Sequence, residues 1–176
     1  MNESAISVRY AKALYNLALE QDKGETIYND LTLIKNTLDG EPLLRNFLKS
    51  PAISGKEKKS TLHTILENSV DSLSLRFIDL ITDKNREMFL YRIALEYIRL
   101  YMENKNYVQV KIISAVELNE KQIEILNKSI SNQLNKEPVI ETVVDKTLLG
   151  GYQLIIGNKQ LDHSVKRMLK DFNKLI

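Results

Sequence analysis

The period of the hydrophobic pattern changes near residue 105, and this change restricts the possible folds more than any other feature of the sequence. In residues 1–105, apolar side chains recur every three or four positions between short polar turns, which is typical of amphipathic helices. In residues 106–176, short β-branched runs alternate with polar residues, and helical patterns lie between and after them. The sequence therefore predicts an α+β protein with a helical domain at residues 1–105 and a small α+β domain at residues 106–176.

We expect the first domain to be a six-helix bundle. Pro42 fits the first position of a helix, and Ser54 followed by Glu57 has the spacing of a capping box. The expected helices cover about residues 4–21, 25–38, 42–50, 54–66, 71–81 and 85–103.

The second domain is predicted to follow the order β-α-β-β-β-α, which gives a small mixed sheet with two helices. Asn119 and Gln122 have capping-box spacing before the first helix, and the second helix follows Ser164. Gly157-Asn158 has the turn chemistry of a β-hairpin. The expected strands cover residues 107–116, 139–144, 152–156 and 159–161, with Pro138 before the second of them.

The first predicted helix is apolar around too much of its circumference for a helix with one buried face. Such a helix buries a stripe about 100° wide, but the apolar residues from Ala5 to Leu19 extend well beyond it. Either this is a central helix of the bundle, or one face enters the core while the other lines a groove for a partner helix. The small side chains of Ala11, Ala13 and Ala18 would permit a partner to approach closely.

Composition excludes several classes of function. The 176 residues contain no Cys, so disulfides, thiolate nucleophiles and zinc–cysteine sites are excluded. The formal net charge of +2 gives no strong field for a polyanion, which disfavours a dedicated duplex-DNA binder. The sequence has no targeting segment and no apolar run of the length that spans a bilayer. We therefore expect it to meet a membrane only indirectly, through a complex.

The sequence gives no sign of catalysis or of a cofactor. Neither His63 nor His163 has neighbours that complete a metal site, and the motifs G-x-S-x-G, H-E-x-x-H and G-x-x-x-x-G-K-[ST] are absent. A triad of Ser164, His63 and Asp162 is formally possible, as in a hydrolase, but nothing in the sequence supports it. We expect no enzyme activity, no metal and no cofactor.

Basic residues gather in two places, which keeps one alternative function open. The first group lies at the start of the fourth predicted helix and the second on the last helix: Lys56, Lys58, Lys59; Lys166, Arg167, Lys170 and Lys174. Solvated helix faces are the simpler interpretation. The alternative is a helical regulatory or nucleic-acid-binding module, whose binding to nucleic acid would depend steeply on salt.

Five segments carry motifs of a known protein family. Residues 9–18 (RYAKALYNLA) are similar to a start R-Y-A-x-A-L-x-x-L-A. Residues 144–152 (VDKTLLGGY) and 161–169 (LDHSVKRML) are similar to V-D-x-S-L-I-G-G-V and I-D-G-S-V-R-x-x-L. Residues 47–56 and 77–86 match a P-x-I stretch and an L-x-x-L-x-x-x-N-R segment. In this order and over the whole length, the chain resembles the delta subunit of bacterial rotary ATP synthases, the counterpart of the mitochondrial oligomycin-sensitivity-conferring protein.

The resemblance implies a stator subunit of the peripheral stalk at the cytoplasmic face of the cell membrane. It implies that the first domain binds the N-terminal helix of an alpha subunit of the catalytic head, in a groove between the first and fifth helices. It also implies that the second domain binds the C-terminus of the stalk's b subunit, so that the head resists rotation. On this basis we expect Tyr10, Ala13, Leu14, Ile78 and Ile81 to line the groove.

The resemblance also carries expectations for the second domain. We expect its signature residues, Gly150, Gly151, Asp162 and Ser164, to shape the domain rather than to contact the stalk. His163 stands where the family usually has Gly, and Thr147 where it usually has Ser. The family's usual Gly at position 163 suggests a turn with positive φ there. His is moderately enriched in that conformation.

Overall fold

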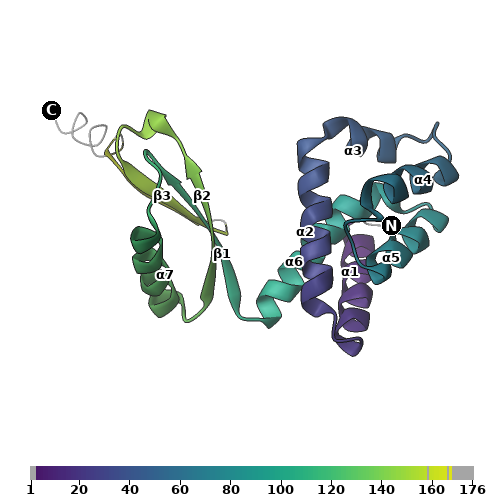
Figure 1. Ribbon diagram of the computed structural model, residues 1–176, viewed down its shortest axis with the longest axis horizontal. Helices are drawn as coiled ribbons and strands as arrows, with labels where there is room; N and C mark the ends of the chain where they lie inside the picture. Colours follow the sequence, from purple (N-terminus) through teal and green to yellow (C-terminus); the bar gives the residue numbers. More distant parts are fainter. Residues whose placement is uncertain (1–2, 158, 166, 168–176) are drawn as a thin grey trace. The chain divides into compact units, whose positions relative to one another are not determined.

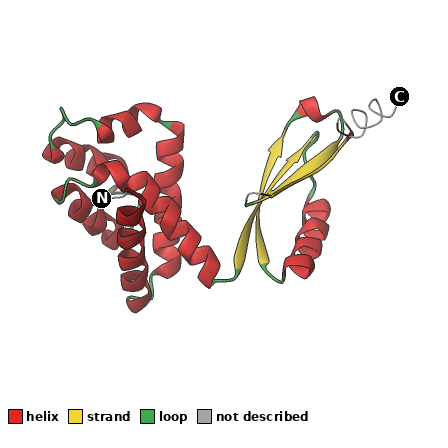
Figure 2. Cartoon of the chain, turned by 180° about the vertical axis from the view of Figure 1, so that it is seen from behind, coloured by secondary structure: helices red, strands yellow, loops and turns green. Residues whose placement is uncertain are grey.

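The computed structural model describes residues 3–157, 159–165 and 167. The chain divides into two compact units, Met1–Tyr101 and Met102–Ile176. The division lies in the last turn of α6 (Leu90–Asn104), just before the polar segment at which the sequence predicts it. The described part of the first unit is helical, and the described strands belong to the second (Figures 1 and 2). The predicted α+β class is confirmed.

Side chains cap the starts of helices in the first unit, among them the predicted Ser54. The helices are α1 (Glu3–Glu20), α2 (Gly24–Gly40), α3 (Pro42–Lys49), α4 (Gly55–Leu66), α5 (Ser72–Asp83) and α6, with the 3-10 turn η1 (Glu87–Phe89) before α6. The Ser54 hydroxyl accepts a hydrogen bond from the Glu57 amide at 3.2 Å at the start of α4. The Asp71 carboxylate accepts from the Leu73 amide at 2.8 Å at the start of α5. These bonds satisfy amides that have no partner inside their own helix.

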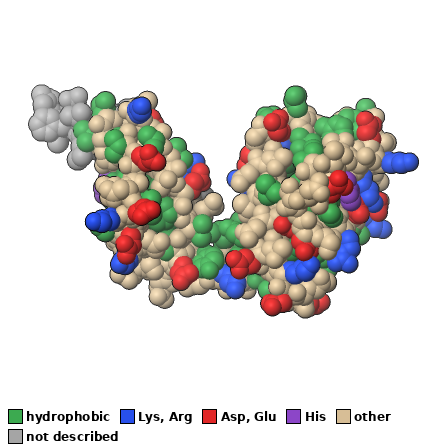
Figure 3. All heavy atoms as spheres, viewed as in Figure 1, with side chains coloured by type: hydrophobic (Ala, Val, Ile, Leu, Met, Phe, Trp, Pro, Cys, Tyr) green, Lys and Arg blue, Asp and Glu red, His purple; other side chains and the backbone are tan. Residues whose placement is uncertain are grey.

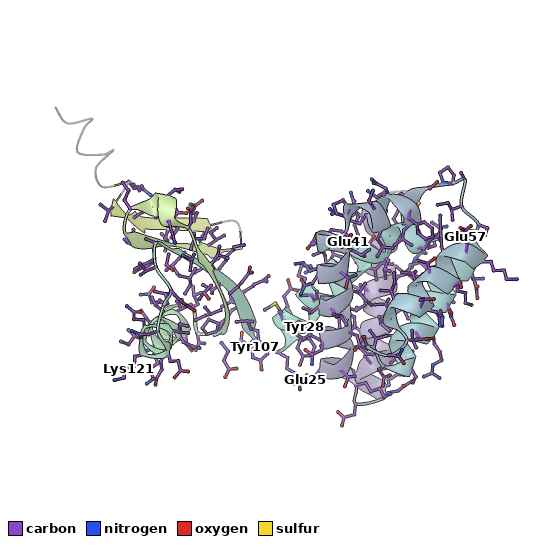
Figure 4. The ribbon with its side chains drawn as sticks, turned by 45° about the horizontal axis from the view of Figure 1, so that its top comes forward. Glu25, Tyr28, Glu41, Glu57, Tyr107 and Lys121 are labelled. Carbon is purple, nitrogen blue, oxygen red and sulfur yellow. The ribbon has the colours of Figure 1, made fainter. Side chains whose placement is uncertain are left out.

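The core of the first unit contains large apolar side chains from most of its helices. Leu31, Ile78, Leu90 and Tyr97 are fully buried. The Tyr97 hydroxyl donates to the carbonyl of Gly24 at 3.2 Å, and burial raises the pKa of Tyr97. The stacked rings of Tyr28 and Tyr101, with centroids 4.5 Å apart, join α2 to the end of α6 (Tyr28 is labelled in Figure 4, where Glu41 marks the junction of α2 and α3).

Buried polar contacts fix the start of α5 against α2. The Asp30 carboxylate accepts hydrogen bonds from the Asp71 amide at 2.9 Å and from the Ser74 hydroxyl at 2.6 Å. Lys23, in the connection between α1 and α2, forms an ion pair with Asp71 at 2.8 Å. Hydrogen bonds from Lys23 and from the Leu73 amide lower the pKa of Asp71.

One lysine of the first basic group is buried, which contradicts the interpretation of that group as a solvated face. The Lys58 ammonium lies 2.8 Å from the Glu87 carboxylate, and the two side chains are 6% and 7% exposed. Lys58 faces inward because Glu87, in the turn η1, supplies its counter-charge. Lys56 is exposed, and Lys59 bonds to carboxylates of α5.

The second unit is a four-stranded mixed sheet with a helix packed on one face. Its elements are β1 (Tyr107–Ser114), α7 (Glu120–Leu134), β2 (Glu137–Val144), the 3-10 turn η2 (Lys146–Leu148), β3 (Gly151–Ile156) and β4 (Lys159–Ser164). The strand order is β2-β1-β3-β4; β1 and β2 are parallel, and the other two pairs are antiparallel. Val110, Ile112 and Leu154 of the sheet form a buried cluster with Ile130 of α7.

The second unit agrees with the prediction in its order and differs in detail. The predicted capping box is present, with Asn119 and Gln122 bonding to each other's backbone amides. The strand predicted to start after Pro138 instead includes it, because β2 is an edge strand and the missing N–H of proline need not pair. The predicted last helix, after Ser164, lies largely outside the described residues.

Candidate helix-binding groove

Helices α1 and α5 meet in the helical unit, which Figure 1 shows with both helices labelled. The ion pair between Lys23 and Asp71 places the C-terminal end of α1 near the N-terminal end of α5. Further along, the rings of Tyr10 and Phe77 meet edge to face with centroids 6.4 Å apart. The two helices are thus held at one end and near the middle.

An apolar groove of about 640 Å³ lies between these helices. Its lining residues come from α1, from the turn directly after it and from α5: Arg9, Tyr10, Ala13, Leu14, Leu17, Gln21, Leu73, Arg76, Phe77 and Leu80. Leu14 is buried at 2% exposure, whereas Leu17 and Leu80 are 39% and 48% exposed. Exposed leucines at the edge of an apolar groove are the feature of a surface that binds a partner.

Helix α1 has two apolar faces, one in the core and one in the groove. One stripe, formed by Ala11, Tyr15 and Ala18, is buried in the core of the unit. The other stripe, which includes Tyr10 and Leu17, lines the groove. Ala13 is exposed and lines the groove as well.

The groove contains three of the five residues predicted for it. Tyr10, Ala13 and Leu14 line it. Ile78 and Ile81 do not, because both are fully buried on the neighbouring, core-facing stripe of α5. The α5 wall is formed instead by the stripe that contains Leu73, Phe77 and Leu80, at positions i, i+4 and i+7. This spacing is visible in the sequence. The stripe that contains Ile78 and Ile81 is apolar too, so the sequence alone does not show which stripe lines the groove.

The predicted signature residues of the second unit make internal contacts. Gly151 has a φ of 75°, and a Cβ at this position would overlap the carbonyl oxygen of His163. A Cβ on Gly150 would lie 3.0 Å from the Val165 side chain. Both positions therefore favour glycine, Gly151 for its conformation and for lack of space.

Asp162 and Ser164 organise the end of β4. The Asp162 carboxylate accepts from the Ser164 amide at 2.9 Å and from the Gln153 side chain at 3.1 Å. Hydrogen bonds from Ser164 lower the pKa of Asp162. The Ser164 hydroxyl accepts from the Arg167 amide at 3.2 Å. These contacts agree with a role in shaping the second unit. That the residues do not contact the stalk stays a prediction.

The expectation of a turn at His163 is wrong. His163 lies within β4, opposite Tyr152, with the ring centroids 5.5 Å apart. Its φ is not positive, because the strand continues through this position. A side chain is therefore accommodated there without strain.

His63 has a partner that sequence reasoning missed. Its Nε2 lies 2.6 Å from the Asp79 carboxylate, which Lys59 also approaches at 3.3 Å. Burial alone would raise the pKa of Asp79, but the hydrogen bonds from His63 and Lys59 outweigh it and lower this pKa. The hydrogen bond that the structure shows for His63 is with Asp79, whereas the Asp162 carboxylate accepts from the Ser164 amide.

The described residues hold no cluster of three or more side chains suited to binding a metal ion. Within the same residues, no helix combines the length and the apolar character needed to cross a bilayer. Basic and acidic side chains are interspersed over the visible face of the helical unit (Figure 3). That arrangement does not resemble the continuous basic surface of a nucleic-acid-binding protein.

An apolar groove between two helices is the arrangement by which helix-in-groove adaptors bind an amphipathic partner helix. The sequence model of the ATP synthase delta (OSCP) subunit family matches residues 6–176. The chain therefore belongs to this family. It is a non-catalytic, peripheral-stalk subunit of ATP synthase, and the family assignment does not favour the regulatory or nucleic-acid-binding alternative.

Curated relatives cover nearly the whole chain. The ATP synthase subunit delta of Alkaliphilus oremlandii is 34% identical over 93% of this chain and 91% of its own length. That of Clostridioides difficile is 35% identical over 94% and 92%, respectively. That of Synechococcus elongatus is 35% identical over 92% and 90%.

The fold is also found in a solved structure. A chain of the Toxoplasma gondii mitochondrial ATP synthase hexamer superposes with a TM-score of 0.69 at 21% identity. The match covers 96% of both chains, so both units of the fold are represented.

Proposed function

We propose that this subunit links the catalytic head of the synthase to the b-subunit stalk. The groove between α1 and α5 holds the N-terminal helix of an alpha subunit, and the second unit binds the C-terminus of the b subunit. The linkage keeps the head from turning with the rotor. The subunit reaches the cytoplasmic face of the cell membrane only through the assembled complex.

The observation that carries the proposal is the open apolar groove on a helix whose other face is already buried. Leu17 and Leu80 are partly exposed on its two walls, and Phe77 is buried between them at 6% exposure. An amphipathic helix with apolar residues at i, i+3, i+4 and i+7 fits such a surface. A well-packed interface of standard size, about 1,600 Å² in total, is compatible with nanomolar binding.

Two modest contacts on one adaptor are enough for a durable link. Once one partner is bound, the other meets its site at a high effective concentration, and the two affinities reinforce each other. The absence of a large charged surface from the visible face agrees with binding that relies on apolar contacts.

Calorimetry with the full chain tests the alpha-subunit contact. The titrant is a peptide of the N-terminal segment of the alpha subunit from the same genome. Leu80→Asp removes an apolar contact from the groove wall and should weaken binding at least about tenfold, since a docked helix would desolvate the new carboxylate whether or not it pairs with Arg76. Leu33→Asp is the matched control: Leu33 is 40% exposed on α2 and does not line the groove, so its affinity should stay at the wild-type value.

A second titration with a C-terminal peptide of the b subunit tests the other contact. Binding should be unaffected by Leu80→Asp, because Leu80 belongs to the first unit. A far-ultraviolet circular dichroism spectrum like that of the wild type establishes that the helical unit of this variant is folded. If the wild-type chain binds neither peptide at micromolar concentrations, the proposed linkage is wrong.

A further inference from the structure

The groove combines an apolar lining with two positive charges and no negative one. Of its ten lining residues, Arg9 on α1 and Arg76 on α5 are charged, and none is Asp or Glu. Both arginines are exposed. They directly precede Tyr10 and Phe77, whose rings are in contact across the groove. Since one residue advances a helix by about 1.5 Å, both arginines lie near the level of that contact.

The carboxylates of α5 and of its cap are engaged elsewhere. Asp71 pairs with Lys23 at 2.8 Å, and Asp79 bonds to His63 at 2.6 Å. Asp83 lies 3.3 Å from Lys59. Among the side chains that the structure describes, none forms an ion pair with Arg9 or Arg76.

Arg76 still interacts with Asp71, but only at longer range. The pKa of Asp71 is lowered first by the hydrogen bond from Lys23 and next by that from the Leu73 amide, while Arg76 adds a smaller Coulombic effect. A carboxylate on a docked partner helix would not compete for Arg76 in this way, because Asp71 is already paired with Lys23.

We propose that the groove selects a partner helix carrying a carboxylate, flanked by apolar residues at helical spacing, that binds between Arg9 and Arg76. This inference rests on the proposed function, in which an alpha-subunit helix occupies the groove. A docked helix removes water from both guanidinium groups, and an acidic side chain at their level compensates that loss. Arginine suits this role because its planar fork binds a carboxylate through two hydrogen bonds.

The competing explanation is that the arginines contribute only their apolar stems. Long cationic side chains commonly cover apolar surface while their charged ends stay in water. Under that explanation, Arg→Met would preserve binding and the acidic residues of the partner would be irrelevant. Under the proposal, Arg→Met and Arg→Gln both weaken binding.

Calorimetry with the full chain and the alpha-subunit peptide separates the two. We expect Arg9→Gln or Arg76→Gln to weaken binding about threefold to tenfold and to reduce its salt dependence. Lys12→Gln is the matched control, because Lys12 is an exposed cation on α1 that does not line the groove. It should leave the affinity within about twofold of wild type.

A charge swap identifies the carboxylate. Each acidic residue of the peptide is changed to Lys in turn, and one of these peptides should lose affinity for the wild-type chain and regain it with Arg76→Glu. If the wild-type chain fails to bind the peptide at all, the proposed function fails and the inference with it. If it binds, but the arginine variants behave like Lys12→Gln or no peptide is rescued, the inference is overturned while the groove assignment stands.

Discussion

Breaking the ion pair between Lys58 and Glu87 should destabilise the first unit strongly. It joins α4 to the turn η1, with Nζ and Oε1 2.8 Å apart and both side chains nearly inaccessible to solvent. Within the described structure, the second carboxylate oxygen of Glu87, Oε2, is buried without a hydrogen-bond partner. Lys58→Met would therefore leave Glu87 in an apolar environment without its cation.

The expected cost follows from this burial. Removing one partner of a buried pair typically costs about 3–5 kcal/mol, because the remaining charge is uncompensated. Replacing both partners by apolar residues is often close to neutral. We therefore expect Lys58→Met to cost about 3–5 kcal/mol, and the double variant with Glu87→Leu to cost at least about 2 kcal/mol less than the two single changes added together.

Denaturant unfolding followed by far-ultraviolet circular dichroism measures these free energies. Lys56→Met is the control, since Lys56 is exposed in the first turn of the same helix. Its loss should be neutral or slightly stabilising, because a positive charge there opposes the helix dipole. A cost below about 1 kcal/mol for Lys58→Met, or additive single costs, would refute the reasoning.

Two further predictions concern local geometry and pH. Gly151→Ala should destabilise the second unit by more than about 2 kcal/mol, because it adds a clash with a strand backbone to the strain of positive φ. Gly157→Ala, at a φ of 56° and with open space around it, should cost only about 1 kcal/mol. Thermal melts monitored by amide NMR measure both changes. The pKa of Asp71 is lowered in the folded state from its ordinary 3.8, mainly by Lys23, so its stabilisation is complete above pH 3.8 and is lost as pH falls through the lowered value. In urea titrations over this range, Asp71→Asn should flatten the pH dependence of unfolding, and an unchanged slope would contradict the assignment.

The sequence is informative about the groove where one helix shows two faces. The surplus of apolar residues on α1 predicts a second surface beyond the core, and Tyr10, Ala13 and Leu14 lie on it. On α5, periodicity alone cannot identify the outer face, since Phe77 and Ile78 belong to neighbouring apolar stripes. Which stripe of α5 meets the core depends on how the other helices pack. The local hydrophobic pattern of α5 does not contain that information.

Partners distant in sequence were the least predictable feature. The lysines near residue 58 are typical of a solvated helix start, but Lys58 is buried because Glu87 lies opposite it, 29 residues away. The pair of His63 and Asp79 is separated by 16 residues and belongs to two helices. In the second unit, Pro138 is compatible with a strand only because β2 is at the sheet edge, and the edge is defined by strand order.

The residues that were misassigned to the groove explain why it stays open. Ile78 and Ile81 fix α5 to the core from behind, and Ala11 and Ala18 do the same for α1. Because these core contacts hold both helices in place, Leu17 and Leu80 on the groove side remain partly exposed in the described structure. A groove whose walls are fixed in advance spares a partner the entropy of ordering them, so more of the apolar contact with Leu17 and Leu80 is available as binding free energy.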